Sequence, residues 1–452
     1  MEEKNNVLVN STPSIEYTLR PITYISWLLG AGVARPRNYS KAITIIKQIV
    51  YLIVCITNMV IVGRDVFIYG SVFALESNIF EFVYFLNIVT FHVSAYYNVC
   101  HGIRQYEKWP ELMDKINELD QKIRRQTPIN DQPIKNVEAL AILTTFAWFP
   151  LTTIVYFLYY YFTNPEYIYV FTVLYIYIVT QSLINSFVFD VVVYVLYYRF
   201  KTVNKLIRHL NEQNNLNESL FDPSLIALKI RRIREIYTGI CHLISTVNDI
   251  YRVHLLLCSV NCFITIVTLL FTTYLNVVEK NYTYILLNNI IVMLCATQFG
   301  LMCWICTLTR QESDEIGRSV HEIVFYCKPV NRDKLNGAGN HFDLEIRQSF
   351  ENLDSEQNFN RSCNHNLNYL VLENFLRRYL DRDCIRNEIN DFSIQLQQYR
   401  VAFSACNFFE VNNALFSGFV GMIITYSIIF IQFYQRPENL DTNLVDHLIK
   451  IF

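Results

Sequence analysis

Seven long apolar runs constrain the fold of this chain more than any other feature of its sequence. A helix needs about 20 mostly apolar residues to cross the hydrocarbon core of a bilayer. The runs meet that length and cover residues 42–62, 79–99, 137–162, 168–198, 253–277, 284–308 and 411–433. Because the bilayer offers no water to satisfy backbone N–H and C=O groups, runs of this length span it as helices. The sequence therefore predicts an all-α membrane protein with seven transmembrane helices.

The composition agrees with a membrane protein and argues against several other classes. Only 17% of the residues are charged and 52% are hydrophobic, against about 25% charged residues in a soluble domain. The net charge is −2 and there is no basic arm, so no nucleic-acid partner is predicted. The sequence lacks the metalloprotease, nucleophile-elbow and phosphate-binding motifs. We therefore predict no enzymatic activity, no cofactor and no metal site.

The charges between the runs predict the orientation in the membrane. Residues 101–136 carry seven Lys and Arg and residues 199–252 carry nine, whereas 63–78, 163–167 and 279–283 carry at most one each. Loops rich in Lys and Arg stay in the cytosol. The N-terminus is therefore predicted to be cytosolic and the C-terminus extracellular. G-protein-coupled receptors also have seven spans but the opposite orientation, so the charge pattern argues against that class.

The segments between the spans divide the chain into five regions. Residues 1–41 are a cytosolic segment whose apolar stretch, 17–29, is too short to span and is expected to form an interfacial or docked helix. Residues 42–310 hold six spans and their cytosolic extensions. Residues 311–410 are a cytosolic segment with a flexible linker at 329–368 and an anchor helix. Residues 411–434 form the seventh helix, and residues 435–452 form an extracellular tail.

Helical periodicity in the cytosolic segments predicts that the spans continue beyond the bilayer. Residues 199–216, 225–252 and 311–327 show apolar positions at intervals of three or four. A similar helical pattern covers residues 370–406, with a stripe formed by Leu372, Phe375, Leu376, Tyr379 and Leu380. Such a stripe needs a partner surface. We expect these helix ends to pack together as an anchor bundle, with a solvated stalk as the alternative.

The last apolar run ends in a short pattern that resembles a known family. Thr425-Tyr426 is followed by five mostly apolar residues and then by Gln432-Phe433. This resembles the C-terminal signature of insect gustatory receptors. Two positions depart from that signature: Ser427 stands where an apolar residue is usual, and Asn407 stands where Gly often follows the Cys. The resemblance covers the architecture of the whole chain and about 30 residues in sequence detail.

The resemblance implies a function and an assembly. Gustatory receptors are tastant-gated, non-selective cation channels, built as homotetramers or heterotetramers in the plasma membrane of chemosensory neurons. Their last helix lines a central pore, the cytosolic helix ends anchor the tetramer, and a small-molecule tastant binds in the outer half of each helix bundle. Gln432 and Phe433 match the position of the gate. Membrane lipids and other gustatory receptor subunits are the further partners expected.

The residues of the last run agree with a pore. Tyr426, Ile429 and Phe433 recur at i, i+3 and i+7, and Thr425, Ile429 and Gln432 form the adjacent stripe. An apolar ring around an axis resists wetting, and amide oxygens can replace part of the hydration of an ion. No carboxylate follows Glu410 within the run, so weak selectivity among cations is expected. The alternative is that Gln432 caps a helix end that faces lipid.

Aromatic and polar side chains in the outer half of the bundle are the candidates for ligand binding. Small-molecule sites combine apolar walls with a few polar groups. The candidates are Glu81, Tyr156, Tyr160, Tyr175, Tyr177, Gln181, Thr273, Tyr274, Asn288, Asn289 and Gln298. The alternative for any single Tyr is an interface anchor or a helix contact.

Three other features are interpreted as structural. Asp190 is a lone acid within the fourth run and is expected to contact a partner in the inner half of the bundle. His92 is expected to be a hydrogen-bonded core residue, and Cys303 and Cys306 to be buried thiols.

Two further functions remain as alternatives. An odorant receptor would share the architecture, but the Thr-Tyr…Gln-Phe ending argues against it. A secondary transporter would show matching halves and interrupted helices, and no such halves are found in the sequence.

Overall fold

The computed structural model describes residues 15–37, 39–73, 78–126, 136, 139–140, 142–143, 147–163, 173–216, 223–278, 280, 282–326 and 384–433. These residues divide into two compact units. The first comprises Met1–Arg199, Ile240–Gln311 and Val401–Phe452, and the second comprises Phe200–Gly239 and Glu312–Arg400. The flexible linker predicted at 329–368, the apolar stripe at 372–380 and the tail at 435–452 lie outside the described residues.

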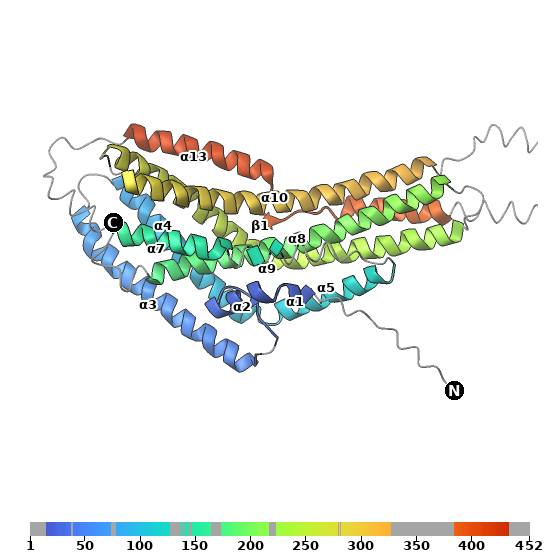
Figure 1. Cartoon of the computed structure of the whole chain (residues 1–452), viewed down its shortest axis with the longest axis horizontal. Coiled ribbons are helices and arrows are strands. Elements are labelled where there is room, and N and C mark those ends of the chain that lie inside the picture. The colour runs from blue at the N-terminus through green and yellow to red at the C-terminus, as the bar shows by residue number, and fades with distance from the viewer. Residues whose placement is uncertain are drawn as a thin grey trace, which may run out of the picture. The chain divides into compact units, whose positions relative to one another are not determined.

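The first unit contains helices at every predicted span (Figure 1). The short N-terminal helices are α1 (Ile15–Thr18) and α2 (Arg20–Leu29), and they are followed by α3 (Lys41–Phe73), α4 (Asn78–Arg104), α5 (Lys108–Arg124) and α7 (Phe149–Thr163). Three long helices contribute to both units: α8 (Val173–Leu216), α9 (Pro223–Val278) and α10 (Tyr282–Tyr326). The last helix is α13 (Asn413–Phe433). The prediction of an all-α protein with several apolar helices is confirmed, although α7 covers only the second half of the run predicted at 137–162 among the described residues.

Length and composition mark several of these helices as membrane spans. Among the described residues, four helical stretches are long and apolar enough to cross a bilayer: Lys41–Ile61, Val173–Glu212, Leu225–Val277 and Tyr284–Val320. Shorter apolar helices occur at Phe149–Leu158 and Asn413–Ile429. The helical patterns predicted beyond the fourth, fifth and sixth spans are also confirmed, because α8, α9 and α10 continue without a break through those residues.

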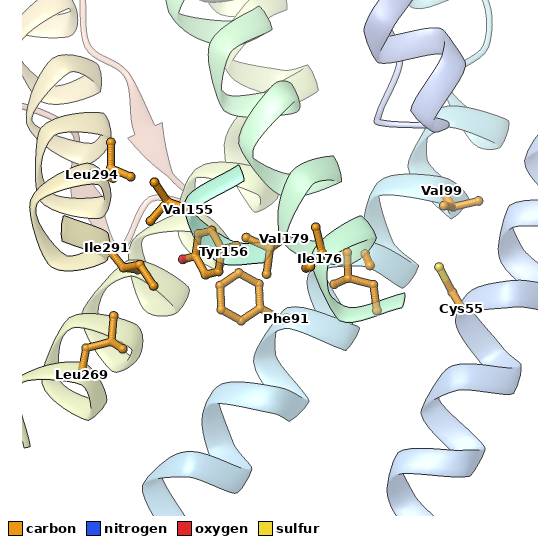
Figure 2. Packing of buried hydrophobic residues seen from close by; sticks show 12 residues of the cluster. Cys55, Phe91, Val99, Val155, Tyr156, Ile176, Val179, Leu269, Ile291 and Leu294 are labelled. Atoms are coloured by element: carbon orange, nitrogen blue, oxygen red, sulfur yellow. The ribbon is translucent and has the colours of Figure 1, made fainter. Parts of the chain in front are cut away.

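The core of the first unit is built around α8. In its most apolar stretch 89% of the residues are buried, whereas only 22% are buried in the corresponding stretch of α3. Figure 2 shows apolar side chains from α3, α4, α7, α8, α9 and α10 that meet in one buried cluster. The other face of α3 exposes a series of apolar side chains: Ile43, Ile46, Ile49, Val50 and Ile53. Contiguous exposed apolar surface of this kind suits contact with lipid tails.

The N-terminal helices are docked against the bundle, which was one of the two expectations for residues 17–29. Backbone carbonyls at the end of α2 accept hydrogen bonds from the spanning helices: Tyr177 donates to Leu29 at 2.8 Å and Gln181 donates to Gly30 at 3.0 Å. The turn that follows has Gly32 at φ 65°, a conformation that side chains with a Cβ rarely adopt. A Cβ at Gly32 would also collide with the amide oxygen of Asn185.

The helix α5 was not predicted, although its sequence carries the signal. Trp109, Leu112, Met113, Ile116, Leu119 and Ile123 recur at helical spacing and are all buried. This apolar period of three to four residues within a charged segment is the signal of an amphipathic helix. An ion pair joins α5 to α8: Arg199 Nε lies 2.6 Å from Asp120 Oδ1, and Arg199 Nη2 donates to Asp120 Oδ2 at 2.7 Å.

The prediction of helical pattern through residue 406 is wrong for its last part. Residues 384–398 are helical, but the chain then leaves the helix and forms a hairpin of β1 (Ser404–Ala405) and β2 (Phe409–Glu410). Val401, Phe403 and Ala405 are buried at every second position, which is the period of a strand. Cys406 and Asn407 have φ of 51° and 62°, so two consecutive left-handed residues reverse the chain.

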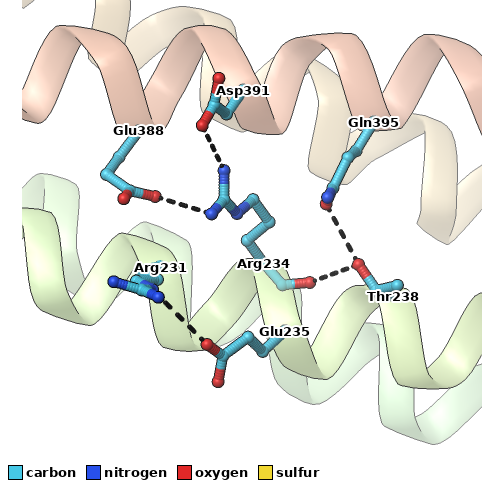
Figure 3. A network of polar contacts seen from close by, with 7 residues as sticks. All are labelled: Arg231, Arg234, Glu235, Thr238, Glu388, Asp391 and Gln395. Atoms are coloured by element: carbon cyan, nitrogen blue, oxygen red, sulfur yellow. Dashed lines mark hydrogen bonds and ion pairs between the residues drawn. The ribbon is translucent and has the colours of Figure 1, made fainter.

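The second unit contains the ends of α8, α9 and α10 together with the helix at 384–398. Its predicted apolar positions Val203, Leu210, Ile230, Ile233 and Ile236 are buried. Figure 3 shows how polar contacts join α9 to the helix at 384–398. Arg234 pairs with Glu388 at 3.1 Å and with Asp391 at 2.9 Å, and Thr238 donates to Gln395 at 3.1 Å.

Candidate pore helix and ligand site

The hairpin before α13 is fixed to α9 and α10 by polar contacts. The backbone N–H of Ser404 donates to Asn248 Oδ1 at 2.8 Å, and Arg310 pairs with Glu410 at 2.8 Å. The N-terminal N–H groups of α13 are also satisfied, because Asn413 N donates to Thr307 Oγ1 and Leu415 N donates to Asn412 Oδ1, both at 2.9 Å. A side-chain acceptor at this position is a standard helix N-cap. The start of α13 is therefore held on two neighbouring helices.

Aromatic contacts define the face of α13 that packs within the protein. Phe419 lies 4.6 Å from Phe299 and 5.4 Å from Phe263 between ring centroids. Tyr426 meets Phe263 edge to face at 5.7 Å. A Cβ on Gly300 would lie 3.3 Å from the ring of Phe416, which explains the glycine at this close approach. This face carries large rings and is directed at α9 and α10.

The opposite face of α13 carries small and polar residues. They are exposed and, with the large apolar Ile428 as the one exception among them, recur every three or four positions: Ala414, Ser417, Gly421, Thr425, Ile428 and Gln432. The hydroxyl of Ser417 donates to the carbonyl of Asn413 at 3.1 Å, and that of Thr425 donates to Gly421 at 2.9 Å. These hydroxyls are satisfied within the helix, yet their oxygens can still accept hydrogen bonds.

The predicted gate residues do not all lie on one face. Thr425 and Gln432 lie on the exposed polar face, whereas Tyr426 packs against Phe263. Ile429 lies between the two faces and is 36% exposed. Phe433 ends α13, and its side chain lies outside the described residues.

Two of the predicted ligand-site tyrosines come together in the buried cluster of the first unit. Tyr156 is 8% exposed and lies among Phe91, Val179 and Ile291 (Figure 2). Its hydroxyl is 3.5 Å from the thiol of Cys295. Tyr175 meets Phe91 edge to face at 5.8 Å. The structure thus gathers rings from α4, α7 and α8 around α10.

Asn288 adds an unpaired polar group on the α10 face that borders this cluster. It is completely buried, and neither its amide oxygen nor its amide nitrogen has a hydrogen-bond partner in the described part of the chain. Asn288, Ile291 and Cys295 follow at i, i+3 and i+7, so they share one helix face. A buried amide without partners costs roughly 1–3 kcal/mol. Such a group needs a water molecule or a ligand.

The remaining candidates for ligand binding have other partners or lie elsewhere. Tyr177 and Gln181 hold the N-terminal turn, Gln298 donates to Asp190 Oδ2 at 2.9 Å, and Asn289 is exposed and donates to Ile285 of its own helix. Thr273 donates to the carbonyl of Leu269 at 2.8 Å, and the ring of Tyr274 lies 6.4 Å from Phe271. The side chains of Glu81 and Tyr160 lie outside the described residues.

The residues interpreted as structural have the expected surroundings. Asp190 is fully buried and bonded to Gln298. His92 is 4% exposed; its Nδ1 contacts the carbonyl of Ile88 at 2.7 Å, so this nitrogen carries the proton and Nε2 accepts from Asn58 at 3.0 Å. Cys303 and Cys306 are buried. The predicted burial and hydrogen bonding of these residues are confirmed, and the position of Asp190 in the inner half of the bundle stays a prediction.

Asn261 is a polar residue that the sequence interpretation missed. It lies on α9, is 3% exposed, and both of its amide atoms lack partners among the described residues. Its position in an apolar run was the signal, because an amide in a spanning helix is costly unless it is bonded.

The fold and the helix lengths are those of a multi-pass membrane protein. The family model for 7tm chemosensory receptors matches residues 19–349 and 361–436, so the chain belongs to that family. No curated protein matches the chain.

Two solved structures support the same fold. The insect olfactory receptor OR5 from Machilis hrabei has a TM-score of 0.54 and 11% identity, and the match covers 92% of this chain and 98% of that one. The same receptor in complex with eugenol has a TM-score of 0.55 and 13% identity, with 93% and 99% covered.

Proposed function

We propose that this chain is a subunit of a tastant-gated, non-selective cation channel of the gustatory type, located in the plasma membrane of chemosensory neurons. The observation that carries the proposal is the division of α13 into two faces. Its rings pack on Phe263 and Phe299. The opposite face is exposed and carries its small and polar residues, flanked by exposed apolar side chains such as Met422 and Ile424. Copies of that exposed face around a central axis would form a path lined by hydroxyl and amide oxygens, which can replace part of the hydration shell of a cation.

The assembly is a tetramer, either of one chain or of this chain with related subunits. In the exposed face of α13, Thr425 and Gln432 are then the residues that contact ions, and Ile429 and Phe433 narrow the pore. Tyr426 acts from the side, because its contact with Phe263 links the pore helix to α9. The cytosolic N-terminus and extracellular C-terminus expected from the loop charges belong to this proposal.

The tastant binds next to Tyr156, Tyr175 and Asn288. Rings supply apolar walls, and the unpaired amide of Asn288 supplies a donor and an acceptor. A small molecule with an apolar body and a hydroxyl or carbonyl group meets these demands. The structure of OR5 in complex with eugenol supports a small-molecule ligand for a receptor with this fold.

Current recordings from cells that express the chain test the ligand site. A panel of tastants identifies an activator, and Asn288→Leu should then raise its half-maximal concentration by roughly 5–150-fold, equivalent to about 1–3 kcal/mol. The matched control is Asn289→Leu, because Asn289 is exposed and bonded to its own helix. Equal concentration dependence in the two variants would exclude Asn288 as a ligand contact.

Cysteine substitution tests the pore separately. A charged thiol reagent applied to the open channel should block Thr425→Cys and leave Phe419→Cys unmodified, because Phe419 is 5% exposed on the packed face. Phe433→Ala should raise the leak current or alter gating. If Thr425→Cys keeps the wild-type current after the reagent is applied, and Phe433→Ala has the leak and gating of the wild type, then α13 does not line the pore.

An odorant-gated channel is the second candidate, and the fold match to OR5 favours it. The ending Thr425-Tyr426…Gln432-Phe433 supports the gustatory type instead. A panel of volatile and non-volatile ligands in the same recordings decides between them.

A further inference from the structure

A polar hollow lies beside the N-terminal helices of the first unit. It has a volume of about 200 Å3 and lies between α1, α2, the segment at 35–37 and α5. That volume is far above the ~10–15 Å3 that one water molecule requires. Three arginines and one glutamate line it: Arg20, Arg35, Arg37 and Glu16. The hollow therefore has a positive excess before any other contact is counted.

Two of these arginines form no ion pair at salt-bridge distance among the described residues. Burial lowers the pKa of Arg35, and the only described carboxylate that acts against this fall, raising the pKa, is Glu107. Arg37 is neutralised, because it pairs with Glu16 at 3.0 Å and with Asp114 at 2.6 Å. Arg35 is held by Tyr106 instead: its Nε donates to the Tyr106 carbonyl at 3.0 Å and its guanidinium carbon lies 3.2 Å from the ring centroid. Arg20 lies 6.0 Å from the ring of Tyr17 and 5.8 Å from that of Tyr24. Neither Arg20 nor Arg35 forms an ion pair with any described residue.

The surroundings of the hollow are those of a membrane surface. The exposed apolar face of α3 begins at Ile43, which is 55% exposed. Immediately before it, Trp27 stacks on Tyr39 at 4.1 Å, and Lys47 Nζ lies 3.5 Å from the Trp27 ring. Aromatic and basic side chains gather in this way at the level of lipid headgroups. On the predicted orientation this is the cytosolic leaflet, where the anionic lipids are found.

We propose that the hollow binds the phosphorylated headgroup of an anionic lipid, a phosphoinositide, with Arg20 and Arg35 as the phosphate ligands. Guanidinium groups match the geometry of phosphate oxygens with two parallel hydrogen bonds. The Tyr106 ring and carbonyl hold the guanidinium of Arg35 in place, so little of its side-chain freedom is lost on binding. Arg20, in contrast, is exposed and lies about 6 Å from the rings of Tyr17 and Tyr24. A soluble inositol phosphate has the same phosphate chemistry, and the test separates the two sources.

Binding to the full-length receptor in phosphatidylcholine nanodiscs tests the site. The probes are a fluorescent short-chain phosphatidylinositol 4,5-bisphosphate and inositol 1,4,5-trisphosphate. Arg20→Gln with Arg35→Gln should weaken lipid binding by about 30-fold, which corresponds to about 1 kcal/mol for each basic residue. The matched control is Lys108→Gln with Lys122→Gln, which removes two positive charges from α5 at positions that do not line the hollow. Its affinity should stay within a factor of two or so of the wild type.

The outcomes separate a built site from general surface charge. Tighter binding of the lipid than of the trisphosphate identifies the membrane as the source, and equal binding identifies the headgroup alone as sufficient; both agree with the proposal. The proposal is overturned if neither probe binds saturably. It is also overturned if the control variant loses as much affinity as the Arg20→Gln, Arg35→Gln variant, or if phosphatidylserine vesicles displace the lipid probe as well as the phosphoinositide does. Arg20→Gln alone guards against misfolding, because Arg20 is exposed, and it should still lower the affinity measurably.

Discussion

Removing the carboxylate of Asp120 should destabilise the protein far more than removing a neighbouring carboxylate on the same helix. The side chains of Arg199 and Asp120 are only 7% and 13% exposed, and two nitrogen–oxygen contacts of 2.6 and 2.7 Å join them. Burial raises the pKa of the Asp120 carboxyl, and the guanidinium of Arg199 acts against that rise. Burial of this pair therefore costs free energy, and each charge compensates part of the cost of burying the other.

The magnitude follows from what Asp120→Ala leaves behind. Loss of one partner of a buried pair costs about 3–5 kcal/mol, because the remaining charge is buried without compensation. At about 2.1 cal/mol/K of unfolding entropy per residue, a chain of 452 residues shifts its melting temperature by about 1 °C per kcal/mol. Asp120→Ala should therefore lower the melting temperature by about 3–5 °C.

Glu118→Gln is the control, two residues away on α5. Glu118 is 64% exposed and pairs with Lys122 at (i, i+4), a contact worth about 0.3–0.5 kcal/mol. In the assay, purified receptor is heated to a series of temperatures, and size-exclusion chromatography measures the fraction that remains folded. The temperature at which half is lost is the thermal midpoint. Combining Asp120→Leu with Arg199→Met should return the midpoint close to that of the wild type, since apolar replacement of a buried pair is often neutral. If Asp120→Ala and Glu118→Gln have the same melting temperature, the pair of Asp120 and Arg199 is not buried in the way described.

Three further substitutions test local features of the fold. Gly32→Ala should lower the yield of folded receptor, because Gly32 has φ 65° and its new Cβ would strike Asn185, whereas Gly63→Ala, which meets no atom within 4 Å, should not. Asn407→Val should cost about 1–2 kcal/mol in thermal stability, since β-branched residues oppose the left-handed φ of 62°, while Asn407→Gly should be tolerated. Arg234→Lys should increase proteolysis of the second unit, because one ammonium group cannot bridge Glu388 and Asp391 as the guanidinium does, and Arg231→Lys, whose side chain is 58% exposed, should behave as the wild type.

The spanning helices and their extensions could be predicted because their signal is repeated over many residues. Runs of about 20 apolar residues and a helical period mark α8, α9 and α10 without reference to any neighbour. The hairpin at 401–410 could not be found in the same way, because Val401, Phe403 and Ala405 show only three repeats of a strand period. Asn407 was the one signal of a turn here, because a glycine often occupies this position in gustatory receptors. The φ of 62° at Asn407 explains that preference for glycine. Asn and Gly are the residues that most readily accept that conformation.

Polar residues within the spans look alike in sequence, and only their partners separate structural from functional ones. Gln181, Gln298 and His92 each have a bonded partner from another segment, so each stabilises the bundle. Asn288 is as deeply buried, yet both of its amide atoms remain unpaired in the described residues. A membrane helix retains such a group at a cost, because the hydrocarbon core offers no water to satisfy it. The same reasoning applies to the hollow beside the N-terminal helices, where Arg37 forms two ion pairs and neither Arg20 nor Arg35 forms one with a described residue. In both places the unpaired group, rather than the residue type, is what directs attention to a ligand.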